Sequence, residues 1–120
     1  MNICNCSCGA DRTDLGRGTT PPIYIDLPAG LVWSDVAELW VTVSQAGIEV
    51  TTKTLDDIET EVIGTITEHF IKLTQEETLK LNEYIPVDVQ ARMADHYGNA
   101  FKSDVLTVHA GKILKDGVIT

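Results

Sequence analysis

Three cysteines near the start of the chain, Cys4, Cys6 and Cys8, have the most distinctive spacing in the sequence. In an extended segment, residues two apart lie on one face, so the three thiols could ligate a metal such as zinc or iron. Zinc sites usually combine C-x₂₋₄-C pairs with a fourth ligand, and no histidine lies nearby in sequence. The odd number of cysteines and the short rings between them argue against a disulfide framework. We therefore expect an exposed tail, with metal binding and intermolecular disulfides as the alternatives.

The other polar residues show no catalytic pattern. The sequence contains no G-x-S-x-G, no P-loop and no G-x-G-x-x-G motif, and its three histidines, His69, His96 and His109, are scattered. The acidic pairs lack the alternating oxygen ligands around a glycine that a calcium loop needs. These pairs are Asp56-Asp57, Glu59 with Glu61, and Glu76-Glu77. We expect neither enzymatic activity nor a cofactor.

Aromatic side chains provide a candidate ligand face. Trp33 and Trp40 could form a platform on which sugar rings stack, as in a carbohydrate-binding or adhesion module, together with the tyrosines Tyr24, Tyr84 and Tyr97. Trp40 alternates with the apolar residues of its segment and so belongs to the opposite face. Ordinary packing in the core or over a sheet is the more frequent role of such residues.

Length and composition describe one acidic globular domain. The 120 residues suit a single core, and the formal net charge of −9 disfavours both nucleic acids and anionic membranes as partners. No apolar run approaches the ~20 residues of a membrane helix. The N-terminus lacks the basic start and apolar stretch of a signal peptide, so we expect synthesis and first folding in a cytoplasm.

The elements that must position these residues are mainly strands. Residues 1–18 have no apolar period and read as a flexible arm, whereas residues 19–120 alternate apolar and polar positions between regularly spaced turn signals. Thr74 and Glu77 form a capping box that opens a helical turn at residues 75–81, which we expect to cross between sheets. The pattern predicts an all-β, immunoglobulin-like sandwich of about seven strands, with a small barrel as the alternative. The expected strands are residues 23–27, 37–45, 48–53, 67–73, 87–93 and 105–109, with a hairpin turn at Ala46 and Gly47 and another turn at residues 95–99.

Four segments resemble a family of short phage and prophage structural proteins. They are RGTTP at residues 17–21, ELWVTVSQAG at 38–47, IKLTQEETLKL at 71–81 and ILKDGVI at 113–119. The family is similar to the immunoglobulin-like N-terminal domain of baseplate upper proteins in tailed phages. The cysteine-rich start of the chain departs from this pattern.

The resemblance implies a virion component attached to tail, baseplate or capsid, present in the host cytoplasm during assembly. Its partners would be other phage structural proteins and further copies of the chain. An extended arm can add to the exposed sheet edge of a neighbour through main-chain hydrogen bonds. We therefore treat five residues of the arm as candidate assembly residues: Arg17, Gly18, Thr19, Thr20 and Pro21.

Overall fold

Short antiparallel strands make up most of the fold. The computed structural model describes residues 1–4 and 15–120. The helical elements are the 3₁₀ turns η1 (Trp33–Asp35) and η2 (Leu55–Asp57) and the helix α1 (Gln75–Leu79). The strands are β1 (Asn2–Cys4), β2 (Pro22–Asp26), β3 (Val36–Gln45), β4 (Ile48–Thr54), β5 (Glu59–Ile63), β6 (Ile66–Lys72), β7 (Val87–Asp95), β8 (Ala100–Lys102) and β9 (Leu106–Val108).

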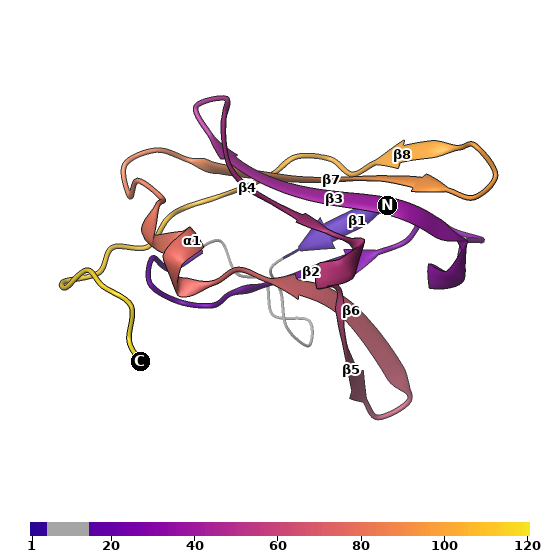
Figure 1. Ribbon diagram of the computed structural model, residues 1–120, viewed down its shortest axis with the longest axis horizontal. Coiled ribbons are helices and arrows are strands. Elements are labelled where there is room, and N and C mark those ends of the chain that lie inside the picture. Colours follow the sequence, from indigo (N-terminus) through magenta and orange to yellow (C-terminus); the bar gives the residue numbers. More distant parts are fainter. Residues whose placement is uncertain (5–14) are drawn as a thin grey trace.

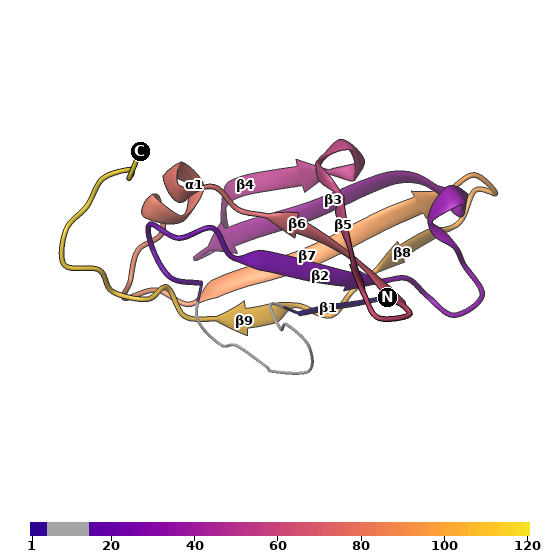
Figure 2. The same ribbon diagram turned by 90° about the horizontal axis from the view of Figure 1, so that it is seen from below.

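Two sheets face each other, as Figure 1 shows from the side and Figure 2 from below. The first has the order β1-β2-β6-β5, and the second has the order β4-β3-β7-β8, with β9 also on β7. Naming the strands in chain order from A to G, with C′ after C, gives sheets ABED and C′CFG, the arrangement of immunoglobulin domains. This confirms the all-β sandwich, with α1 in the crossover from β6 to β7. The nine described strands exceed the expected number because β1, β5 and β8 were not among the predicted strands.

The core lies between the two sheets and follows the predicted alternation. On β3, Leu39, Val41 and Val43 are buried, whereas Trp40 between them is 46% exposed. Burial of one such aliphatic side chain stabilises the fold by about 1.5–3 kcal/mol, so the alternation decides which face of each strand turns inward. The opposite sheet contributes Ile23, Ile25, Ile71 and Leu73, and β7 contributes Val87, Val89, Ala91 and Met93.

The hairpin of β3 and β4 turns where the sequence predicts. Ala46 and Gly47 both have positive φ angles, 50° and 77°. Two-residue hairpin turns of type I′ require positive φ at both central positions, which matches the right-handed twist of the strands. The register then shifts between Val43 and Ser44, where the ladder contains a bulge.

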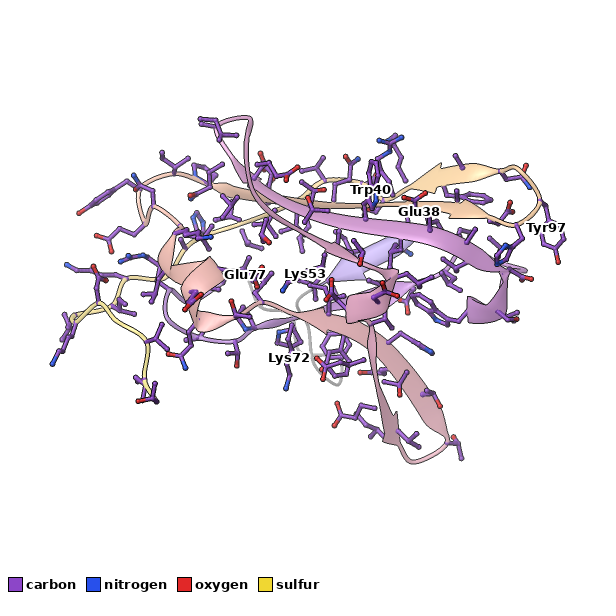
Figure 3. The ribbon with its side chains drawn as sticks, viewed as in Figure 1. Glu38, Trp40, Lys53, Lys72, Glu77 and Tyr97 are labelled. Carbon is purple, nitrogen blue, oxygen red and sulfur yellow. The ribbon has the colours of Figure 1, made fainter. Side chains whose placement is uncertain are left out.

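Helix α1 is attached to the second sheet by the same side chain that caps it. The Thr74 hydroxyl accepts from the Glu77 amide at 3.2 Å, and Glu77 Oε1 accepts from the Thr74 amide at 2.8 Å, which completes the predicted capping box. Glu77 also forms an ion pair of 2.7 Å with Lys53 of β4 and accepts a hydrogen bond of 2.6 Å from Thr51. Figure 3 shows Glu77 and Lys53 pointing toward one another between the sheets.

The strand partner of β7 differs from the prediction. The turn after β7 returns through β8, and residues 105–109 contribute only the shorter β9 further along the same edge. Ser103 separates the two segments: its amide donates to the Ala91 carbonyl at 2.9 Å, and its hydroxyl accepts from the Ala91 amide at 3.0 Å. A side chain therefore replaces one bond of the ladder, which alternation in sequence does not show. Within residues 59–73 the sequence favoured a strand only at 67–73, but the first half is also a strand, and β5 and β6 form a hairpin.

The described parts of the predicted 1–18 arm belong to the sandwich, which corrects the expected boundary. Asn2–Cys4 forms β1 and pairs with β2. Leu15 is fully buried in the core, and its amide donates to the His109 carbonyl at 2.7 Å. Residues 5–14 lie outside the described part of the chain. Across the described residues, no helix is long and apolar enough to cross a membrane.

Candidate functional site

The hairpin of β5 and β6 is largely exposed. In Figure 1 it extends from the first sheet on the side away from the second sheet, and every residue of β5 is exposed. Strand β2 pairs with β6 only from Lys72 to Phe70, so the rest of β6 has β5 as its single neighbour. Near the turn, Ile63 and Ile66 lie directly opposite each other and are 39% and 62% exposed. The hairpin therefore presents an open strand edge with apolar side chains at its tip.

Carboxylates share the outer face of this hairpin with the two isoleucines. Glu61 lies directly opposite Glu68, and alternate residues of a strand lie on one face. Like charges directly opposite each other destabilise a pair of strands. Glu68 Oε2 is shielded from solvent and has no hydrogen-bond partner among the described residues. Lys72 is a cation on the same face of β6, two residues beyond Phe70. We call Glu61, Ile63, Ile66 and Glu68 the hairpin patch.

Trp40 marks a second surface, on the outer face of the other sheet. Figure 3 shows Trp40 and Glu38 on the side of β3 that faces away from the first sheet. The Arg92 guanidinium lies 5.9 Å from the centre of the Trp40 ring, and Arg92 is directly opposite Lys102 of β8. A shallow pocket of about 130 Å³ lies here, lined in part by Trp40, Ala94, Ala100 and Glu38. We call Trp40, Arg92, Ala94, Ala100 and Lys102 the sheet patch.

A third feature is a cleft where β2 and β6 diverge. Its volume is about 470 Å³, and it is lined by aromatic, apolar and acidic residues that include Tyr24, Trp33 and Glu68. Trp33 stacks on His69 with ring centres 4.5 Å apart and an angle of 18° between the planes. Burial lowers the pKa of His69 below its ordinary value, which favours the neutral ring against the indole.

Trp33 is held in the cleft by the 3₁₀ turn η1. Asp35 Oδ2 accepts from the Val32 amide at 2.9 Å, and the Asp35 carbonyl accepts from the His96 amide at 3.0 Å. The turn is thereby attached to the connection between β7 and β8. Trp33 and Trp40 consequently line different hollows, so the structure does not bring together the single aromatic platform that the sequence suggested.

The predicted assembly residues 17–21 make contacts within the chain. The Arg17 guanidinium donates to the Leu79 carbonyl of α1 at 3.1 Å and forms an ion pair of 3.2 Å with Asp116. The Thr19 carbonyl accepts from the Thr78 hydroxyl at 2.9 Å. The carbonyl of Pro21 accepts from the Leu73 amide at 3.1 Å. Gly18 and Thr20 lie between these anchors, so the segment joins α1 and the C-terminal residues to the sandwich.

The cysteine prediction is tested only at Cys4, because Cys6 and Cys8 lie outside the described residues. Cys4 is disulfide-bonded, contrary to the expectation that disulfides are disfavoured here. The side chain of Cys4 shares the outer face of the first sheet with Tyr24, its partner across the ladder. In the described part of the chain, no group of three or more histidine, cysteine or acidic residues is arranged to hold a metal ion.

The surfaces that stand out in the structure were only partly visible in the sequence. The alternation placed Trp40 on the face opposite Leu39 and Val41 but left open whether that face is exposed; in the structure Trp40 is 46% exposed on the outer face. Arg92 and Lys102 were missed because their proximity depends on the pairing of β7 with β8. Ile63 and Ile66 were missed because the sequence favoured only the second half of the β5–β6 region, although the turn at Gly64, with a φ of 63°, offered a signal for a hairpin.

Comparison with known proteins finds no matching family model, no matching curated protein and no matching solved structure.

Proposed function

We propose that this chain is a structural component of a phage particle and acts through protein–protein contacts. The observation that carries the proposal is the hairpin of β5 and β6, with its exposed edge and apolar tip. An open strand edge offers unpaired amides and carbonyls to another chain. Exposed apolar side chains beside it add the area that a partner would bury. The four segments that resemble short phage structural proteins support the particle as the setting.

The first test is quantitative mass spectrometry of phage particles purified on density gradients from the source population. We expect the chain at a constant ratio to the major capsid protein in every fraction that contains particles. That ratio separates a tail or baseplate ring from a capsid component. Absence of the chain at good sequence coverage would contradict the proposal.

A paired-variant test asks whether the hairpin mediates incorporation. We expect the double variant Ile63→Asp/Ile66→Asp to be lost from particles, because it places charges on the apolar tip. The matched control is Ile48→Asp/Leu114→Asp, which changes two isolated exposed apolar residues that are 71% and 98% exposed. Equal incorporation of both variants would exclude the hairpin as the attachment element.

A second candidate function, carbohydrate binding, is favoured by the cleft that contains Trp33. Aromatic faces with nearby carboxylates, here Trp33 and Glu68, are suited to sugar rings and their hydroxyl groups. A glycan array with the unmodified chain, Trp33→Ala and Trp40→Ala separates the possibilities. Binding that is lost in Trp33→Ala and retained in Trp40→Ala would support this function. No binding by the unmodified chain would remove it.

A further inference from the structure

One surface of the molecule carries a pair of negative side chains, and a different surface carries a pair of positive side chains. Glu61 lies opposite Glu68 on the hairpin, and Arg92 lies opposite Lys102 on the second sheet. The salt bridges formed within the described residues involve neither pair. Repulsion within each pair destabilises the isolated chain. Contact between the negative pair and the positive pair of another chain would be attractive.

Each charged pair lies beside apolar surface, and the shapes of the two apolar surfaces are complementary. The hairpin patch projects Ile63 and Ile66, whereas the sheet patch contains a shallow hollow beside Trp40, Ala94 and Ala100. The hollow of about 130 Å³ is close to the size of cavities of about 150 Å³ that accommodate a benzene ring. It therefore has room for an aliphatic side chain. Glu38 and Arg92 also line the hollow, and Lys102 lies next to it, directly opposite Arg92 on β8.

The position of the two patches restricts how copies can meet. Figure 1 shows the hairpin of β5 and β6 extending from the first sheet on the side away from the second, while Figure 3 shows Trp40 on the outer side of the second sheet. Because the patches lie on opposite sides, two copies cannot satisfy both contacts with each other. Pairing of β5 with β5 of a second copy would set carboxylates against carboxylates. The remaining arrangement is head to tail, which produces a closed ring or a filament.

We propose that copies of this chain assemble head to tail, with the hairpin patch of one copy on the sheet patch of the next. Glu61 and Glu68 then face Arg92 and Lys102, and an isoleucine of the hairpin tip enters the hollow beside Trp40. The inference rests on the proposed function as an assembly component and identifies its partner as a second copy.

Charge reversal provides the decisive experiment, with sedimentation velocity as the readout. Samples at up to about 1 mM in about 0.15 M salt screen the repulsion between acidic chains while allowing weak, small interfaces to form. We expect the unmodified chain to sediment faster as its concentration rises. The variants Glu61→Lys/Glu68→Lys and Arg92→Glu/Lys102→Glu should each remain monomeric, because both patches of each variant then carry the same sign.

Mixing the two variants restores complementarity in both directions. The reversed hairpin of the first fits the reversed sheet patch of the second, and the unchanged patches fit each other. We therefore expect the equimolar mixture, and the quadruple variant alone, to associate like the unmodified chain. Recovery on mixing also shows that both variants are folded, which circular dichroism of each variant would check independently.

Matched controls separate contact from overall charge. Glu49→Lys/Glu76→Lys and Lys112→Glu/Lys115→Glu produce the same changes in net charge at exposed positions outside both patches. These variants should associate like the unmodified chain. A monomeric unmodified chain at the highest concentration, association of either reversed variant alone, or no recovery on mixing would overturn the inference. Because these measurements use the purified chain, they leave the presence of the chain in particles to its own test.

Discussion

Glu77 links local helix capping to the packing of the two sheets. Its carboxylate accepts hydrogen bonds from Thr74 and Thr51 and pairs with Lys53. Burial alone would raise the pKa of Glu77, but the hydrogen bonds and the Lys53 ammonium outweigh it and lower the pKa to about 2. Since the side chains of Glu77 and Lys53 are only 15% and 14% exposed, the pair is less screened than a surface ion pair.

Replacing Glu77 by Gln should make stability less dependent on pH. At pH 7 we expect the variant to lose roughly 1–3 kcal/mol, below the full linkage value because solvent still reaches the site. A lowered pKa stabilises the folded state above the unfolded pKa of 4.5, and this contribution disappears as the pH falls toward about 2. Urea unfolding between pH 7 and pH 2 should show the two proteins converging.

The control for this prediction is Glu76→Gln, which removes an exposed carboxylate from the same helix. It should change stability by only a few tenths of a kcal/mol at every pH. A constant difference between Glu77→Gln and the unmodified chain across the pH range would contradict the assigned linkage.

At the scale of elements, Ser103 allows β8 and β9 to share one side of β7. It separates two three-residue strands, and its hydroxyl accepts from the buried Ala91 amide at 3.0 Å. The Gln90 side chain also donates to the Ser103 carbonyl at 2.9 Å. This edge includes Lys102, so Ser103 helps to position the sheet patch.

Replacing Ser103 by Ala should leave the Ala91 amide without its side-chain acceptor. A buried unsatisfied donor costs about 1–3 kcal/mol, and we expect a loss of that size in chemical unfolding. Hydrogen exchange at the amides of β8 and β9 should accelerate more than exchange in β3. The exposed Ser34→Ala is the matched control and should unfold like the unmodified chain. Unchanged exchange at this edge would refute the role of Ser103.

At the scale of the whole molecule, one core joins both sheets. The segment around Arg17 connects helix α1 and the C-terminal residues at one end of this core. Leu39 is fully buried among side chains from both sheets. Arg17 bonds to α1 and pairs with Asp116, so distant parts of the chain meet at one guanidinium. The patches on the hairpin and on the second sheet depend on this common core for their relative placement.

Replacing Leu39 by Ala should therefore weaken the whole molecule. Large-to-small substitutions in a core cost about 2–5 kcal/mol, a large share of the 5–15 kcal/mol typical for a domain. We expect a lower unfolding midpoint that is identical by fluorescence and circular dichroism. The control Ile48→Ala, at a residue 71% exposed, should change little. Separate transitions for the two probes would show that the sheets do not unfold together.

The sequence by itself determined the local features, because each depends on residues close together in the chain. Alternating burial on β3 and β7, the turn at Ala46 and Gly47 and the capping box of Thr74 and Glu77 are of this kind. They sufficed for an all-β sandwich and for placing Trp40 on the strand face opposite Leu39 and Val41, whereas the exposure of that face came from the structure. Only the tertiary structure decided which strands are neighbours. Main-chain hydrogen bonds can form between strands of any sequence, so the sequence gives little information about strand pairing. That choice separated Trp33 from Trp40, placed Arg92 opposite Lys102, and buried Leu15 within a segment that reads as an arm.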